Sequence, residues 1–317
     1  MRRLTRLTLS AAGLLLFATS SAFAAQPVPL DPAGNDNDLV PTGKGWGERQ
    51  DTAPPRVNPN GKAPPGGGGG GSGNGIFYHG GPVMRGTTHA YYIWYGNWSG
   101  NNATTILTDL MNNMGGSPYF NINTTYYDGA GPVVNSVALA GTTSDSYSQG
   151  SALSDTAIKN VVSSAITSGR LPKDTNGVYF VLTSADVNAT SGFCTQYCGW
   201  HTHGTISGSD IKYSFVGNPE RCPNSCAWDT TTSPNGNIGA DGMASIIAHE
   251  LEEAVTDPDL NAWYDRRGYE NADKCAWTFG NTYTANGGLA NMKLGSRDFL
   301  IQRNWVNAAG GYCAQAY

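Results

Sequence analysis

Residues 241–257 constrain the fold of this chain most strongly, because the sequence marks both ends of a helix there. Asp241 is a good N-cap, and Pro258 disfavours helical geometry at Asp257. Between these signals, apolar residues recur at helical spacing, at Met243, Ile246, Ile247 and Val255. The sequence therefore predicts a helix that starts at Asp241, stops before Pro258 and turns an apolar stripe toward a core.

The predicted helix carries the pattern H-E-x-x-E in His249, Glu250 and Glu253. His249 and Glu253 lie one turn apart and share a face. Glu250 projects about 100° round from His249, where the general base stands in the H-E-x-x-H helix of zinc hydrolases. Glu253 replaces the second histidine; a carboxylate can ligate zinc, but its negative charge makes the ion a weaker Lewis acid. The pattern predicts a zincin-like helix with Glu250 as the catalytic residue, and the alternative is a solvated acidic helix face.

A metal site built on one helix needs a further ligand from another segment. The segment 263–275 follows the helix and contains Glu270 and Asp273. We therefore expect a metal held by His249 and Glu253, with Glu270 or Asp273 completing the site. The alternative for Glu270 and for Asp273 is an acidic surface turn.

A second histidine motif, His201 and His203, has the H-x-H spacing of some metal sites. The two side chains would face one side of an extended segment. In a glycine-rich segment this spacing is more often incidental, so His201 is the less favoured third ligand.

The first residues predict an export signal. Arg2, Arg3 and Arg6 precede an apolar run from Leu7 to Ala18, and residues 22–24 form a small-x-small cleavage site. We expect residues 1–24 to be a signal peptide and the protein to be secreted, with the cell wall or the periplasm as further locations.

The rest of the chain divides by composition. Residues 25–75 are rich in proline and glycine and predict a disordered linker, and residues 76–317 predict one folded domain. Only 14% of residues are charged, and the formal net charge is −5, or −8 once the three leader arginines are removed. This acidic balance argues against nucleic acid as a partner. The absence of a later long apolar run argues against membrane insertion.

Six cysteines, an even number, are typical of an oxidising compartment and of three disulfides. Short loops favour Cys194–Cys198 and Cys222–Cys226, which leaves Cys275 to pair with Cys313. A four-cysteine zinc knot formed by the first two pairs is the alternative.

Secondary structure is expected at seven further places. Helices are predicted at 101–114 and 154–169, and strands at 90–95, 133–140, 177–183, 211–216 and 299–305. Helices mixed with strands at this spacing predict an α/β or α+β domain with a mixed sheet.

Several motifs in residues 76–317 resemble the EXORDIUM / phosphate-induced protein family. They are residues 81–84, 93–97, 179–184, 193–201, 222–227, 233–236, 241–250 and 261–264. The resemblance covers residues 76–317 in order and includes all six cysteines. The resemblance implies a protein secreted to the cell wall and apoplast and linked to growth promotion, and it assigns no catalytic activity. It also implies that Glu at position 253 is a family trait, whereas members typically have Asn in place of Asp257. The glycine-rich leader and arginine-rich signal indicate a bacterial member.

Two functions follow as hypotheses. The first is a secreted metal-dependent hydrolase that acts on an extracellular peptide or cell-wall substrate, with a divalent metal, zinc, as cofactor and some tolerance of other divalent ions. The second is a non-catalytic extracellular protein that binds cell-wall glycan or a receptor. The 16 Tyr and 8 Trp favour the second, because exposed aromatic rings stack on sugars.

Overall fold

The computed structural model describes residues 41–44 and 75–317. The predicted signal peptide (1–24) and most of the predicted linker (25–75) therefore lie outside the described residues. No helix of the described ranges combines the length and the apolarity that crossing a membrane requires.

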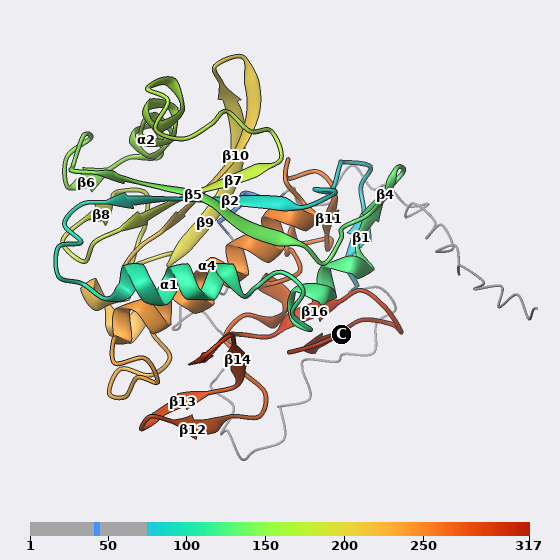
Figure 1. Cartoon of the computed structure of the whole chain (residues 1–317). Coiled ribbons are helices and arrows are strands. Elements are labelled where there is room, and N and C mark those ends of the chain that lie inside the picture. The colour runs from blue at the N-terminus through green and yellow to red at the C-terminus, as the bar shows by residue number, and fades with distance from the viewer. Residues whose placement is uncertain (1–40, 45–74) are drawn as a thin grey trace, which may run out of the picture.

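A five-stranded mixed sheet forms the centre of the fold (Figure 1). Its strands, in spatial order, are β5 (Val137–Asp145), β2 (Thr88–Tyr95), β7 (Gly177–Thr183), β10 (Ser209–Val216) and β9 (Gly199–Ile206). The first four are parallel, and β9 runs antiparallel to β10 at one edge. Every residue of β7 is buried, as expected for a central parallel strand covered on both faces.

Helices cover both faces of this sheet (Figure 1). Helices α1 (Ala103–Asn112) and α4 (Ile238–Thr256) lie on one face, and α2 (Asp155–Thr167) lies on the other. The remaining helical elements are short: α3 (Pro223–Cys226), η1 (Phe120–Thr125), η2 (Pro219–Arg221) and η3 (Asp273–Cys275). The α/β class with a mixed sheet, expected from the sequence, is confirmed.

Small two-stranded sheets lie in the loops and in the C-terminal residues 283–317, which pack on the side of α4 away from the main sheet (Figure 1). They pair β1 (Phe77–Tyr78) with β11 (Trp263–Tyr264), β3 (Tyr127–Asp128) with β4 (Gly131–Pro132), β6 (Ala152–Leu153) with β8 (Asn188–Ala189), β12 (Tyr283–Ala285) with β13 (Gly288–Ala290), β14 (Met292–Leu294) with β15 (Arg297–Phe299), and β16 (Asn304–Val306) with β17 (Tyr312–Ala314). Helix α4 is consequently enclosed between the sheet and this C-terminal region.

Two predicted strands were placed wrongly. The strand expected at 133–140 is β5, which starts at Val137. The strand expected at 299–305 is divided between β15 and β16, because residues 300–303 leave the extended ladder between them.

Three disulfides are present, and two of the favoured pairings were wrong. Cys194 bonds to Cys222 and Cys198 to Cys226, so two chain segments are joined side by side rather than closed into short loops. The third, Cys275–Cys313, is as predicted. All six cysteines are oxidised, which excludes a zinc knot for the first four in this structure.

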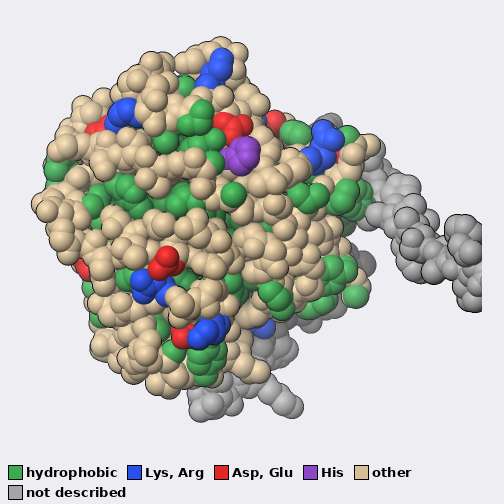
Figure 2. All heavy atoms as spheres, in the orientation of Figure 1, with side chains coloured by type: hydrophobic (Ala, Val, Ile, Leu, Met, Phe, Trp, Pro, Cys, Tyr) green, Lys and Arg blue, Asp and Glu red, His purple; other side chains and the backbone are tan. Residues whose placement is uncertain are grey.

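Charged side chains are sparse on the face of the molecule that Figure 2 shows, where lysine, arginine and acidic residues are scattered rather than gathered into a patch. The charged groups of greatest interest lie inside the protein, around α4.

Candidate metal centre

Helix α4 carries His249, Glu250 and Glu253 in its C-terminal half. Asn237, not Asp241, is its N-cap: the Asn237 side chain accepts a hydrogen bond from the backbone N–H of Ala240. Every residue of the helix from Met243 to Thr256 is buried. The H-E-x-x-E side chains therefore lie in the interior, which excludes the solvated acidic face.

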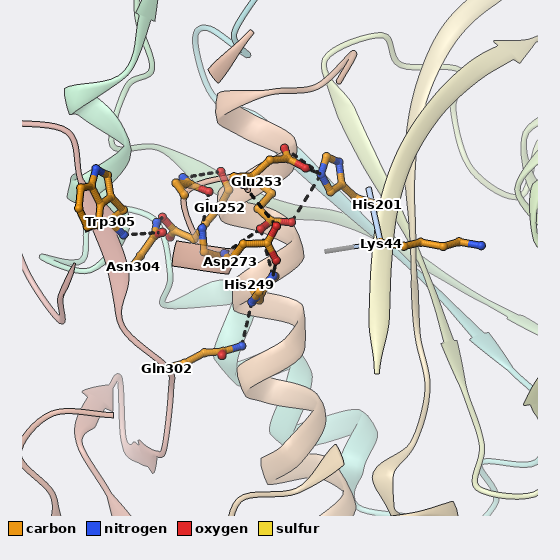
Figure 3. Close-up of polar contacts among 12 residues, drawn as sticks. Lys44, His201, His249, Glu252, Glu253, Asp273, Gln302, Asn304 and Trp305 are labelled. Carbon is orange, nitrogen blue, oxygen red and sulfur yellow. Dashed lines mark hydrogen bonds and ion pairs between the residues drawn. The ribbon is translucent and has the colours of Figure 1, made fainter. Parts of the chain in front are cut away.

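One group of potential ligands forms around His249 (Figure 3). Its Nε2 lies 3.0 Å from Oε1 of Glu253 and 3.5 Å from Oδ1 of Asp273. The backbone N–H of Asp273 donates to Oε1 of Glu253 at 3.1 Å. Asp273 opens η3, so this hydrogen bond docks the segment after the helix against α4, as the third-ligand expectation required.

A second group forms around His201, on the edge strand β9. Its Nε2 lies 3.2 Å from each carboxylate oxygen of Glu270 and 3.6 Å from Oε2 of Glu253. Glu253 thus belongs to both groups, with one oxygen directed toward each histidine. Figure 3 shows His201 directed from the strand toward the helix. We call His201, His249, Glu250, Glu253, Glu270 and Asp273 the buried cluster.

The spacing of these atoms suits a divalent ion. With bonds of about 2.0–2.2 Å, the edges of a tetrahedral site measure about 3.3–3.6 Å. The four His-to-carboxylate separations of the two groups run from 3.0 to 3.6 Å. Three atoms of each group lie within 4.8 Å of one another. Either group could supply three protein ligands and leave a fourth position for water, the arrangement of catalytic zinc.

Glu250 differs from the other acidic residues of the cluster in its hydrogen bonding. It is fully buried, and neither carboxylate oxygen has a hydrogen-bond partner among the described residues. It lies against Gly199 of β9, where an added Cβ would come within 3.0 Å of Oε1. A buried carboxylate without a partner is costly in its charged form, so Glu250 either takes up a proton or needs a cation beside it.

Two neighbouring acidic residues do have structural partners. Glu252 accepts a hydrogen bond from the side-chain amide of Asn304. Asp257 accepts from the backbone N–H groups of Asn261 and Ala262, both at 2.6 Å. These contacts fix the end of α4 and set Glu252 and Asp257 apart from the ligand groups.

Burial dominates the protonation of the cluster. It raises the pKa of Glu250 and of Glu270 well above the usual range, and that of Asp273 to about 7. It lowers the pKa of His201 to about 4. Glu253 is the exception, because the charge and hydrogen bond of His249 outweigh its burial and lower its pKa. Without a bound cation, the raised pKa values therefore favour protonated Glu250, Glu270 and Asp273, whereas Glu253 stays ionised.

Gln302, which the sequence did not point to, fixes the other side of His249. Its side-chain oxygen accepts from the backbone N–H of Trp277 at 2.7 Å, and its nitrogen lies 3.0 Å from Nδ1 of His249. In the neutral ring Nδ1 is then the acceptor, and the proton stands on Nε2, toward Glu253. Burial lowers the pKa of His249, but the charge of Glu253 and the hydrogen bonds to Asp273 and Glu253 outweigh it and raise that pKa well above its usual value, and in the charged ring the Gln302 amide would have to turn. Metal binding at Nε2 would require the Nε2 proton to leave and the Gln302 amide to turn.

A third grouping, His203, Asp210 and Asp259, lies at the surface. Lys212 contacts Asp210 and lies 2.9 Å from Asp259, so its ammonium already offsets part of the negative charge of this group. It is an ion-pair network rather than a metal site.

The structure brings the predicted site residues together. His249, Glu253, Glu270, Asp273 and the predicted base Glu250 all belong to the buried cluster. His201, ranked below them from sequence, belongs to it as well. Whether the cluster binds a metal and performs catalysis stays a prediction.

The fold and the site together define an α/β protein with three disulfides and an interior cluster of histidines and carboxylates around α4, the longest helix of the described residues. The chain belongs to the phosphate-induced protein 1 family, whose conserved region matches residues 76–293. This confirms the family resemblance found in the sequence.

Curated relatives come from plants. Protein EXORDIUM-like 3 of Arabidopsis thaliana is 33% identical over 277 residues, which cover 74% of this chain and 81% of that protein. Protein EXORDIUM-like 5 of the same plant is 33% identical over 277 residues, covering 72% and 74%. Protein PHOSPHATE-INDUCED 1 of Nicotiana tabacum is 27% identical over 218 residues, covering 59% and 66%. These relatives do not support the expectation of a bacterial source. No solved structure matches the chain.

Proposed function

We propose that this protein is an extracellular, metal-dependent hydrolase of peptide bonds. His249, Glu253 and Asp273 would hold a divalent ion, zinc in the first instance, and His201 with Glu270 would close the other side of Glu253. The observation that carries the proposal is the set of 3.0–3.6 Å separations between histidine nitrogens and carboxylate oxygens. The three disulfides support an extracellular location.

The charge of the cluster supports a cation. Among the described residues, no lysine or arginine pairs with Glu250, Glu253, Glu270 or Asp273. Buried carboxylates in that situation either take up protons or bind a metal. A divalent ion would reverse the upward pKa shifts of Asp273 and Glu270, because it stabilises their ionised forms.

The residues divide the chemistry between them. When bound, the ion would lower the pKa of water and polarise the scissile carbonyl. Glu250 would take the proton of the attacking water while the new C–O bond forms, and would return it to the amine as the C–N bond breaks. His249 and Glu253 would hold the geometry, and Gln302 would orient the His249 ring.

Hydrolysis of a denatured protein substrate tests the proposal. The zinc-loaded protein should release new amino termini, and the chelator-treated protein should release none until zinc is restored. A metal-loaded protein that is inert toward protein substrates would contradict the hydrolase.

The contact of Gln302 with His249 favours a second candidate, a non-catalytic extracellular binding protein. In that function the cluster would be a proton-sharing structural core, with the Nε2–H of His249 donating to Glu253. The two candidates differ in whether the cluster exchanges its protons for a metal.

A further inference from the structure

The edge strand β9 carries His201 of the buried cluster and has an outer edge on which no further strand of the main sheet lies. It is the last strand of the sheet, and only β10 pairs with it as a strand among the described residues. The backbone N–H of His201 lies on the edge of β9 away from β10 and donates to the carbonyl oxygen of Gly43 at 3.1 Å. A segment distant in sequence, residues 41–44, thus lies on the edge beside the cluster.

Side-chain contacts hold this segment in place. Nζ of Lys44 lies 2.6 Å from a carboxylate oxygen of Asp155, at the start of α2. The same ammonium lies 5.2 Å from the ring centre of Tyr197 and 5.3 Å from that of Trp200. Figure 3 shows Lys44 directed away from the cluster, on the far side of β9 from His249. The backbone of Gly43 therefore contacts the backbone of His201, and the side chain of Lys44 anchors the segment at Asp155.

Position 43 accepts only glycine in this arrangement. Gly43 has a φ of +67°, and an added Cβ would lie 1.8 Å from the carbonyl oxygen of His201. Gly43 is buried, whereas Thr42 beside it is exposed. The absence of a side chain therefore lets the chain approach the strand edge.

We infer that the outer edge of β9 is a binding site for a polypeptide segment that places a glycine, in the left-handed backbone conformation of Gly43, opposite His201. Residues 41–44 are its internal occupant. This inference names the substrate class of the proposed hydrolase and rests on that proposal for its catalytic meaning. Binding along a sheet edge gives affinity through the backbone, and the close approach at His201 selects glycine.

The buried cluster is closed to solvent in this structure, and residues 41–44 lie on its β9 side. His201, His249, Glu250 and Glu253 have no more than 1% exposure, so a substrate has no open path to them. Because the segment is tethered to the domain, it competes at an effective concentration on the order of millimolar with any external peptide. Displacement of residues 41–44 would free the edge for another chain.

Amide hydrogen exchange tests this inference without requiring metal or activity. Gly43→Val should release the segment and speed exchange at the His201 amide at least about tenfold, because that N–H loses its acceptor. Thr42→Ser is the control: it changes the neighbouring, exposed residue but keeps the hydroxyl that accepts from the backbone N–H of Lys44, and should leave the rate within about twofold of the native rate. Lys44→Met, which removes the contact with Asp155, should speed exchange in the same direction as Gly43→Val. Equal exchange in the native protein and in Gly43→Val would overturn the docking of the segment.

A synthetic peptide with the sequence of residues 38–47 tests the edge as a polypeptide site. At millimolar concentration it should restore protection of the His201 amide in the Gly43→Val protein, and the same peptide carrying Gly43→Val should not. Failure of the first peptide, or equal effects of both, would overturn the polypeptide site. A protein that gives the expected exchange pattern but takes up no zinc and cleaves no protein substrate would contradict the hydrolase and leave the binding edge intact.

Discussion

Oε1 of Glu253 lies 3.0 Å from Nε2 of His249, one helical turn before it, in the interior of the protein. Neither side chain has measurable solvent exposure. An ion pair or a shared proton can stabilise this contact alone, but it does not account for Asp273, which lies 3.5 Å from the same nitrogen. A divalent cation among the three would neutralise both carboxylates.

Glu253→Gln should weaken binding of the metal at least about 100-fold, because a neutral amide replaces the shared anionic ligand. Isothermal titration of the metal-free variant with zinc measures this. Glu252→Gln is the control: Glu252 is equally buried and adjacent, but it bonds to Asn304 and belongs to neither ligand group. If both variants bound zinc like the native protein, Glu253 would not be a ligand.

Glu250→Gln should leave the fold and the metal in place and reduce turnover about 10²–10⁴-fold, the range expected for a general base. The glutamine keeps the shape of the side chain, and Glu250 has no hydrogen-bond partner to lose among the described residues. Rates on a protein substrate, taken with the metal content of the same sample, check this. Full activity at full metal content would remove Glu250 from the mechanism.

The metal-free protein should lose stability as the pH rises from about 5 to about 8. Burial raises the pKa of Asp257 and of Asp273 to about 7, whereas an unfolded aspartate titrates near 3.9. The folded state therefore binds more protons than the unfolded state in this range, and ionising each group on raising the pH costs stability. His249, with its raised pKa, acts in the same direction above about 6.5.

Urea unfolding of chelator-treated protein at several pH values measures this slope, which is at most about 1.4 kcal/mol per pH unit for each group. Zinc affinity should rise over the same range, because binding displaces these protons. A metal-free protein that grew more stable toward pH 8 would show that the cluster is not protonated as described.

Replacing Cys275 and Cys313 by serine should lower both stability and metal retention. The bridge spans 38 residues, which corresponds to about 4 kcal/mol in the chain-entropy treatment. Cys275 ends η3, which begins at Asp273, so the bridge also holds a proposed ligand.

The control replaces Cys194 and Cys222, a bridge away from Asp273. Cys198–Cys226 stays in place and closes nearly the same loop, so this variant should lose less stability than the Cys275/Cys313 variant and should keep the metal. If the Cys275/Cys313 variant also kept its metal, the third ligand would move from Asp273 toward His201.

The sequence was informative wherever local chemistry decides the structure. The helix predicted at 154–169 is α2, and Ser154 caps it with its hydroxyl accepting from the backbone N–H of Ala157. The uniformly apolar segment 177–183 is the central strand β7. The start of α4 was missed because Gly239 and Gly242 have low helix propensity, and the contacts of Gly239 with Asn218 and Glu220 are not visible in any local pattern.

Long-range pairing was the part that local patterns could not supply. His201 reaches the cluster only because β9 is the edge strand beside α4, and that strand order is not visible in the spacing of two histidines. The first two disulfides likewise follow from two segments lying side by side, whereas loop length alone favoured neighbours in sequence. Gln302 carried no signal, because a lone glutamine is an ordinary surface residue in sequence.

The metal content of the purified protein tests the central claim most directly. Protein expressed with its disulfides intact and handled without chelators should contain about one equivalent of zinc or a similar divalent ion by elemental analysis, and Glu253→Gln handled identically should contain almost none. Two equivalents would indicate that both histidine groups are filled around Glu253. Less than about 0.2 equivalents, with no uptake from added zinc, would contradict the metal centre and leave the buried cluster as a proton-sharing core.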